Sequence, residues 1–229
     1  MGWQDRTVKM LGEEAVKILG NARVAVFGLG GVGGNCVEAL ARAGVGHLTL
    51  IDADTVDETN LNRQLIATRA TVGMEKTEAA KERILSLNPD CDVTALKMFY
   101  GAETADSFDV SRYDYIADCI DSVSSKLQLI ERCTEAGTKI ISCMGTGNKL
   151  HPEMLEISDI TKTSVCPLAR VMRRELKARG IGHLTVLFST ESPISAEGGR
   201  TPGSVSFVPS CAGIMIAGKI IRDLIQLTH

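Results

Sequence analysis

The sequence lacks the paired cysteines that a structural zinc site or a disulfide framework needs. Its seven cysteines are scattered over 229 residues, and none of them forms a C-x-x-C pair. A zinc ion therefore has no ligand set at the usual spacing. The number of cysteines is odd, and the first residues do not form the charged segment followed by an apolar one that is typical of a secretory signal. Both features favour a reduced cytoplasmic setting. We expect no zinc and no disulfide framework.

Long apolar runs and a strong net charge are also missing. The apolar run from Cys211 to Ala217 is followed closely by Lys219, Arg222 and Asp223, well before the roughly 20 apolar residues that a membrane span needs. We expect a buried helix there and no membrane contact. The formal net charge is −3, so the chain lacks the overall positive field of a general nucleic-acid binder. Any contact with RNA must be regional.

Short apolar runs alternate with helix-like stretches along the first two thirds of the chain. The runs occupy 24–27, 47–51, 93–98, 115–120 and 139–142, and the helix-like stretches occupy about 35–43, 75–87 and 124–136. This alternation predicts an α/β, Rossmann-like fold: a mainly parallel sheet with helices on both faces.

The sequence after Gly147 predicts further strands in MLEISDI and HLTVLFST, a helix in PLARVMRRELKARG, a loop in AEGGRTPGS and a final helix. No Pro/Ser-rich linker or repeat divides the chain. We therefore expect a single domain over 1–229, with a nucleotide-binding core at about 20–147 and an elaboration at about 148–229 that extends the sheet.

A glycine-rich turn, GLGGVG, follows the first apolar run and precedes the first helix. Its G-x-G-x-x-G spacing predicts that the turn binds the phosphates of a nucleotide. Gly28 would permit the tight turn, Gly30 would let backbone N–H groups approach phosphate oxygens, and Gly33 would let the helix pack close to the strand. The positive N-terminal end of that helix favours an anion.

An aspartate follows the second apolar run and gives this motif two interpretations. Asp52 lies about 20 residues beyond the glycines, where Rossmann folds place a carboxylate on a ribose hydroxyl. This arrangement alone is compatible with a nicotinamide-dependent oxidoreductase. The cations further along the chain weigh against that interpretation.

Charged side chains follow in NLNRQ (60–64), at Lys76 and in CIDS (119–122). Each is expected at or just beyond the end of a strand. Arg63 and Lys76 can neutralise the β- and γ-phosphates of a triphosphate, and Asp121 can hold a magnesium ion that offsets charge on departing pyrophosphate. Hydride transfer needs no such set. The sequence favours ATP and Mg²⁺ over a dinucleotide.

Together, GLGGVG, DAD, NLNRQ, Lys76 and the acid of CIDS resemble the adenylating domain of the ubiquitin-activating-enzyme superfamily, the HesA/MoeB/ThiF group, over about 6–147. Enzymes of that group join a carboxylate to AMP. The resemblance implies that Asp52 binds ribose, that Asp121 binds magnesium and supports adenylation, and that Arg63, Lys76 and Arg6 bind phosphates. Arg6 would reach the site of a partner subunit, which implies a homodimer.

The resemblance assigns two sets of site residues. The catalytic set is Asp121, Arg63, Lys76 and Arg6. The nucleotide-binding set is Gly28, Gly30, Gly31, Gly33, Asp52, Asp54, Asn60, Asn62, Arg63, Gln64, Lys76, Asp121 and Ser122.

The second half of the chain also resembles a family, the bacterial tRNA threonylcarbamoyladenosine dehydratases. The matching segments are ISDITKTSVCPLARVMRRELKARG, LFSTE and GSVSFVPSCAGIMIAGKIIRDL. This resemblance implies that the activated carboxylate belongs to a threonylcarbamoyl group on tRNA, which then closes into a ring and releases AMP. An intramolecular nucleophile is held at high effective concentration, so such an enzyme needs no thioester. Cys166 and Cys211 remain the two candidate nucleophiles should a thiol be used.

A basic segment could contact the tRNA backbone. Its residues are Lys162, Arg170, Arg173, Arg174, Lys177 and Arg179, with Arg200 in the later loop. His151 and His183 have no partner visible in the sequence, and we expect structural roles for them.

Three other functions stay open at this point. One is adenylation of a ubiquitin-like sulfur-carrier protein, although the enzymes that do this usually carry the two C-x-x-C pairs that are missing here. Another is the nicotinamide-dependent oxidoreductase. The last is a nucleotide-binding adaptor without activity.

Overall fold

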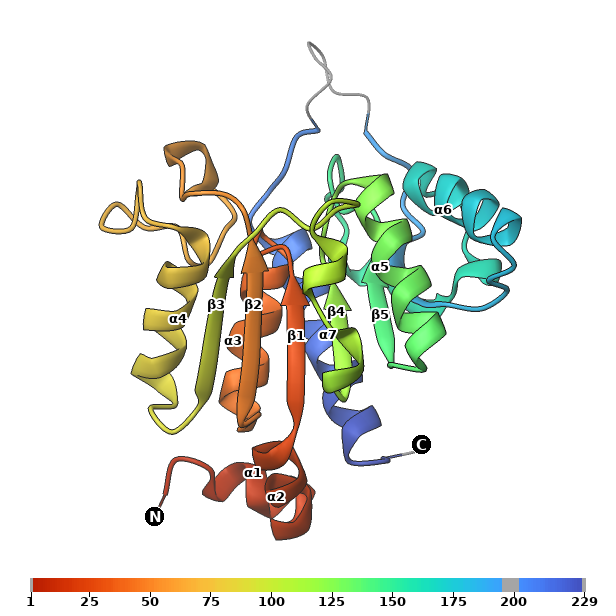
Figure 1. Cartoon of the computed structure of the whole chain (residues 1–229). Coiled ribbons are helices and arrows are strands. Elements are labelled where there is room, and N and C mark those ends of the chain that lie inside the picture. The colour runs from red at the N-terminus through yellow and green to blue at the C-terminus, as the bar shows by residue number, and fades with distance from the viewer. Residues whose placement is uncertain (1, 195–201, 228–229) are drawn as a thin grey trace.

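Seven strands form one sheet in the computed structural model, which describes residues 2–194 and 202–227 (Figure 1). The strands are β1 (Arg23–Phe27), β2 (His47–Asp52), β3 (Asp92–Lys97), β4 (Tyr115–Asp118), β5 (Ile140–Cys143), β6 (Leu155–Asp159) and β7 (Thr185–Ser189). Their order across the sheet is β3-β2-β1-β4-β5-β7-β6. Every pairing is parallel except that of β6 with β7, which is antiparallel. The first six strands of that order therefore end at one edge, the upper edge in Figure 1.

Seven α-helices surround the sheet in the described ranges. They are α1 (Asp5–Leu11), α2 (Glu13–Asn21), α3 (Gly33–Ala43), α4 (Lys76–Leu87), α5 (Val123–Ala136), α6 (Pro167–Ala178) and α7 (Phe207–Leu224). Short 3₁₀ turns follow the same numbering: η1 (Glu58–Asn60), η2 (Ala105–Ser107), η3 (Val110–Arg112), η4 (Pro152–Met154) and η5 (Ile160–Lys162).

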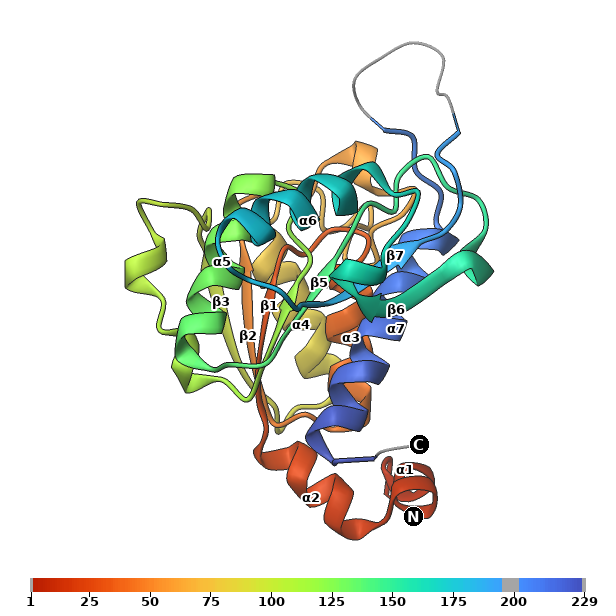
Figure 2. The same ribbon diagram turned by 90° about the vertical axis from the view of Figure 1, so that its right-hand side faces the viewer.

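Helices cover both faces of the sheet. Buried side chains of α3, α4 and α7 pack on one face of the central strands, and those of α5 and α6 pack with β7 on the other. Figure 2 shows α3 and α7 on the opposite side of the sheet from α5. The predicted Rossmann-like fold is confirmed, because apolar strands buried on both faces need helices on both sides.

Most element boundaries agree with the sequence to within a residue or two. Asn88 ends α4 before Pro89, and Gly137 ends α5 in the left-handed conformation with φ of 71°. Both endings follow from local chemistry, because proline restricts the residue before it and glycine tolerates positive φ. The apolar run in α7 is part of a helix whose buried residues face the sheet. No helix in the described ranges is long and apolar enough to cross a bilayer.

The two N-terminal helices were not predicted. Helix α1 has no buried residue, and α2 buries only Ala15 and Leu19. They lie below the amino ends of the strands in Figure 1, far from the carboxyl edge of the sheet.

Candidate nucleotide-binding site

The glycine turn lies between β1 and α3 and is closely packed at two positions. Gly28 has φ of +84°, and a Cβ there would approach the carbonyl oxygen of Cys119 to 2.7 Å. A Cβ on Gly33 would come within 1.7 Å of the carbonyl oxygen of Gly28. Only glycine fits at these two points, because the first needs positive φ and the second brings helix and turn into backbone contact.

Gly30 leaves an open approach to the N-terminus of α3, whereas Gly31 does not. A Cβ on Gly30 would have nothing nearer than the Nε2 atom of Gln64, at 3.9 Å, whereas Gly31 packs against Pro209 of α7. No side chain in the described part of the chain caps α3, and the first turn of this helix contains no acidic residue. The helix N-terminus therefore keeps the electropositive character that favours an anion such as phosphate.

Asp52 ends β2 beside this turn and accepts two backbone hydrogen bonds. Its Oδ2 accepts from the N–H of Leu29 at 2.6 Å, and its Oδ1 accepts from the N–H of Asp54 at 2.8 Å. The carboxylate is thereby fixed against the glycine turn. Its oxygens retain lone pairs for further donors, such as the hydroxyl groups of a sugar.

Lys76 reaches the same edge from the start of α4. Its ammonium lies 2.6 Å from Oδ2 of Asp54 and 3.9 Å from Oδ1 of Asp52. The lysine is only 6% exposed, whereas the side chain of Asp54 is 68% exposed. A phosphate can compete with a partner that is so largely solvated, because a solvated ion pair is weak.

The NLNRQ segment divides into residues that hold the fold and residues that face the site. Asn60 is buried and forms a reciprocal capping box with Asp57, and Asn62 donates to the carbonyl oxygen of Ser204 at 3.0 Å. The guanidinium of Arg63 donates to the carbonyl oxygen of Thr59 and to Oδ1 of Asn62. The observed contacts of Asn60 and Asn62 are therefore structural.

Gln64 is the exception in this segment. It is 7% exposed, its Nε2 faces Gly30, and its Oε1 has no hydrogen-bond partner among residues 2–194 and 202–227. A buried polar atom without a partner costs free energy, and a donor on a bound nucleotide would relieve that cost.

Asp121 and Ser122 lie on the turn that connects β4 to α5. Asp121 is exposed and makes no ion pair or side-chain hydrogen bond with any residue in the described ranges. Ser122 precedes the first turn of α5, and its hydroxyl lies 3.0 Å from that of Ser124. The backbone of Cys119 packs closely against Gly28 of the glycine turn. Asp121 therefore lies at the same edge of the sheet, and its exposed carboxylate is accessible to a ligand there.

Arg6 lies elsewhere. It is exposed on α1, at the opposite end of the sheet from the glycine turn (Figure 1). It does not join the site of its own chain.

Three of the arginines around α6 already contact other residues of the chain. Arg173 donates to the carbonyl oxygen of Thr163 at 2.8 Å, Arg174 pairs with Glu175 at 2.8 Å, and Arg179 pairs with Glu131 and Glu175. Lys162, Arg170 and Lys177 are exposed and have no ion-pair partner in the part of the chain that is described. Arg200, and most of the predicted AEGGRTPGS loop, lie outside the described residues.

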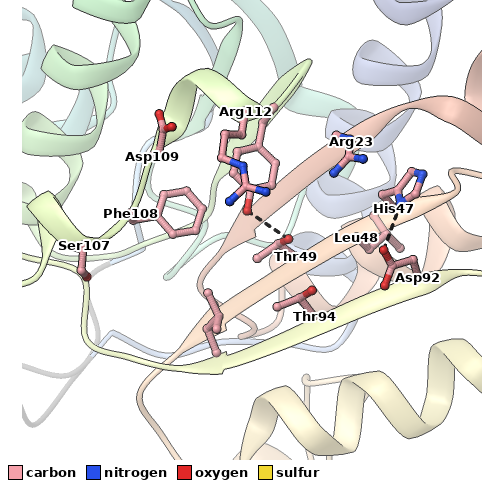
Figure 3. Close-up of a pocket in the computed structure, with 12 residues that line it drawn as sticks. Arg23, His47, Leu48, Thr49, Asp92, Thr94, Ser107, Phe108, Asp109 and Arg112 are labelled. Carbon is pink, nitrogen blue, oxygen red and sulfur yellow. Dashed lines mark hydrogen bonds and ion pairs between the residues drawn. The ribbon is translucent and has the colours of Figure 1, made fainter.

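Two hollows are found away from the glycine turn. One, of about 260 Å³, is lined by the first residues of β1, β2 and β3 together with the segment 107–113 (Figure 3). None of the predicted site residues lines it. The other, of about 640 Å³, runs between α5 and α6 and is lined partly by Arg174.

Burial makes most of the thiols poor nucleophiles. It raises the pKa of Cys91 to about 11 and the pKa values of Cys133 and Cys143 to about 12. Burial also raises the pKa of Cys36 and of Cys119 well above the ordinary thiol range. Such thiols stay protonated at neutral pH and do not react. Cys166 is buried at the start of α6, and Cys211 is half-buried in α7.

The two histidines pair with acids at the surface. His151 lies 2.8 Å from Glu153, whose hydrogen bond raises the pKa of the imidazole, and His183 lies 3.2 Å from Asp159. The first pair joins near neighbours in the chain and the second joins residues 24 positions apart; the structural roles of the two histidines stay a prediction.

A buried ion cluster at this edge was missed by sequence reasoning. Asp118 and Lys126 are completely buried and lie 3.0 Å apart, and Ser142 donates to Asp118 at 2.5 Å. A lysine in a helix ordinarily indicates a solvated face, so the sequence carries no signal for this cluster.

Comparison with known proteins gives a consistent result. A family model described as the ThiF family matches residues 4–229. The chain is 42% identical over 233 residues to the tRNA threonylcarbamoyladenosine dehydratase of Bacillus subtilis, a match that covers 94% of this chain and 92% of that protein.

Solved structures of the Escherichia coli enzyme of the same name resemble this fold closely. The AMP complex has a TM-score of 0.92 at 33% identity, and the ATP complex has a TM-score of 0.88 at 32% identity. Each match covers 98% of this chain and 95% of the other. The molybdopterin-synthase adenylyltransferase of Salmonella typhimurium is 40% identical, but over 131 residues and 57% of this chain only.

Proposed function

The chain belongs to the ThiF family, and on that premise we propose that it is an ATP-dependent dehydratase of threonylcarbamoyladenosine in tRNA. It adenylates the carboxylate of that modification and promotes its cyclisation. The observation that supports this most strongly is the match to named dehydratases along nearly the whole chain, beyond the nucleotide-binding half that other adenylating relatives share.

The residues at the carboxyl edge fit ATP. The open space at Gly30 and the start of α3, which no described side chain caps, suit phosphates. Oε1 of Gln64, without a partner among the described residues, suits a donor on the nucleotide. Asp52 would accept from the ribose, and Lys76 would exchange its contact with Asp54 for phosphate oxygens. Arg63, which precedes Gln64 in the chain, would bind the β- and γ-phosphates.

One carboxylate at the carboxyl edge of the sheet is suited to hold a magnesium ion. No group of three or more potential metal-ligating side chains occurs in the ranges that the structure describes, but Mg²⁺ on ATP usually needs only one or two carboxylates in addition to the phosphates. Asp121 is the residue that would hold it. When bound, the ion would neutralise charge on the departing pyrophosphate.

The chemistry then follows in two steps. A carboxylate oxygen of the threonylcarbamoyl group attacks the α-phosphorus of ATP, the bond to the bridging oxygen breaks, and pyrophosphate leaves. A nucleophilic atom of the same modification next attacks the activated acyl carbon, the ring closes, and AMP departs with the carboxylate oxygen. One water is lost from the tRNA while ATP becomes AMP and pyrophosphate.

The enzyme's contribution is activation and alignment. The second nucleophile is already attached to the substrate, so its effective concentration is high without an enzyme thiol. This agrees with the raised pKa values of the buried cysteines. Lys162, Arg170 and Lys177 would contact tRNA phosphates, since their charges are not paired within the described residues.

We further propose that the active form is a cytoplasmic homodimer. Arg6 lies on α1 at the far end of its own sheet (Figure 1). If it binds phosphate, it must do so in the site of a partner subunit.

Release of AMP tests this function. The protein is incubated with ATP, Mg²⁺ and tRNA that carries the linear modification, with unmodified tRNA as the matched control. We expect AMP with the modified tRNA alone, and a nucleoside product lighter by one water. AMP formation that required a small carrier protein ending in Gly-Gly, and not tRNA, would contradict the proposal.

Adenylation of a sulfur-carrier protein is the second candidate, favoured by the partial match to the molybdopterin-synthase adenylyltransferase. It predicts a stable complex with a small ubiquitin-like partner. The shorter coverage and the missing C-x-x-C pairs make it the weaker candidate.

A further inference from the structure

The buried cluster of Asp118, Lys126 and Ser142 occupies the space behind the turn 119–122. Lys126 donates to Oδ2 of Asp118 at 3.0 Å, to Oγ of Ser142 at 3.2 Å and to the carbonyl oxygen of Cys143 at 2.7 Å. All three protons of the ammonium are used. The cluster therefore joins the carboxyl ends of β4 and β5 to the first turns of α5.

Stability alone is a weak reason for such a cluster. Both charged side chains have no exposed surface, and removing two charges from water costs about as much as their attraction returns. An apolar pair of similar volume would often hold these elements equally well. An ion pair fixes the distance and direction between its two groups, and an apolar pair does not.

That geometry is transmitted to the turn 119–122 through Asp118, whose Oδ1 accepts from the N–H of Ile120 at 3.1 Å. At the other end of the turn, the backbone N–H of Lys126 donates to the carbonyl oxygen of Ser122 at 3.0 Å as part of helix α5. The N–H of Cys119 also donates to the carbonyl oxygen of Phe27 at 2.8 Å. Cys119 and Ile120 pack on the core, whereas the side chain of Asp121 is exposed and makes no ion pair or hydrogen bond in the described ranges.

We propose that Lys126 is a positioning residue, which acts through Asp118 to hold the turn 119–122 so that the Asp121 carboxylate meets the metal ion on ATP. This inference rests on the proposed function, which assigns the metal to Asp121. Lys126 does not touch the nucleotide, because its side chain is completely enclosed. Its effect is on where Asp121 lies relative to the glycine turn.

Metal binding measured without turnover tests this role. Mn²⁺ is titrated into the full-length protein with a non-hydrolysable ATP analogue, and free Mn²⁺ is followed by electron paramagnetic resonance. For Lys126→Met we expect the dissociation constant of Mn²⁺ in the ternary complex to rise by about 10-fold or more, the usual effect of losing a residue that orients a metal ligand. The affinity for the analogue without metal should change by less than about 3-fold, since the glycine turn, Asp52 and Lys76 are unchanged.

Lys149→Met is the matched control. Lys149 is also a buried lysine, 3% exposed, and donates to the carbonyl oxygen of Glu191 rather than to the turn. Its replacement removes a comparable buried charge and should leave Mn²⁺ affinity at the wild-type value.

Ser142→Ala is the variant to measure if Lys126→Met does not fold. It removes one hydroxyl group from the cluster and keeps both charges, so a smaller rise in the Mn²⁺ dissociation constant is expected. Wild-type Mn²⁺ affinity in whichever of the two variants folds, with only a lower melting temperature, overturns the positioning role. Loss of Mn²⁺ affinity in Lys149→Met of the same size as in Lys126→Met overturns it as well.

The proposed function is judged separately. Wild-type protein that binds Mn²⁺ with the analogue but releases no AMP with modified tRNA contradicts the function and leaves the positioning role intact. Wild-type protein that binds no Mn²⁺ with the analogue contradicts both.

Discussion

Two lysines at the carboxyl edge of the sheet lie near the starts of helices. Each pairs with an aspartate at or just after the end of a strand, but the two pairs differ in their exposure to solvent. Lys76 of α4 pairs with Asp54, whose side chain is 68% exposed. Lys126 of α5 pairs with Asp118, and neither side chain has any exposed surface. The first pair can be opened by a ligand, whereas the second cannot.

The comparison separates binding from positioning within one site. An ammonium whose partner is solvated can transfer to phosphate oxygens at little cost. An ammonium with three buried acceptors is part of the framework, and its removal leaves an unpaired buried charge. This difference supports the proposals that Lys76 binds the nucleotide and that Lys126 holds the turn that carries Asp121.

The largest expected effect is on stability. Lys126→Met should lower the free energy of unfolding by about 3–5 kcal/mol, because it leaves Asp118 buried without a partner. Lys76→Met should lower it by about 1 kcal/mol or less, because Asp54 is already solvated. Urea denaturation followed by circular dichroism measures both, and equal losses would remove the distinction between the two pairs.

Next come the two aspartates that flank the glycine turn. Asp121→Ala should reduce AMP formation by on the order of 100-fold or more, through loss of a key electrostatic element, while ATP binding persists. Asp52→Ala should weaken ATP binding first, because its carboxylate is fixed beside Leu29 at the glycine turn. Calorimetric titration with ATP and an assay of AMP release distinguish the two roles. Variants that behave alike in both measurements would contradict this division.

A complementation experiment tests whether the site includes a residue of the partner subunit. Arg6→Ala and Asp121→Ala subunits are each inactive if Arg6 acts in the neighbouring site. Mixing them in equal amounts should restore about a quarter of wild-type activity, because half of the dimers are then mixed and each has one intact site. Activity that stays at the level of the separate variants after subunit exchange would show that Arg6 does not act in this way.

The smallest effects are expected on α6, where paired and unpaired cations lie on one helix. Arg170→Ala and Lys177→Ala should each reduce the salt dependence of tRNA binding by about one charge. Arg174→Ala should reduce it less, since Glu175 already neutralises that guanidinium. Filter binding over a range of KCl concentrations gives the slopes. If Arg174→Ala has the largest effect, this helix face contacts tRNA differently from the proposal.

The sequence predicted those parts of the molecule that local chemistry determines. Strands and helices followed from apolar periodicity, and the requirement for Gly28 and Gly33 followed from their spacing around the first turn. The sequence also predicted Lys76 at the carboxyl edge of the sheet, and the structure places it there beside Asp54; its contact with phosphate stays a prediction.

What the sequence could not show depends on contacts between distant segments. Lys126 has the appearance of a solvated helix residue, and only the packing of α5 against β4 and β5 reveals that it is enclosed. In the same way, Asn60 is part of a motif, but its side chain accepts from the N–H of Asp57 at the start of η1. Arg173 is held by Thr163, and Arg174 pairs with Glu175.

Transfer of oxygen tests the central claim most directly. Modified tRNA with ¹⁸O in both carboxylate oxygens of the threonylcarbamoyl group is incubated with the protein, ATP and Mg²⁺, and the AMP is analysed by mass spectrometry. Adenylation of that carboxylate predicts one ¹⁸O atom in the phosphate of AMP, because the carboxylate oxygen leaves with it. AMP that contains no ¹⁸O while the tRNA loses water would contradict the account.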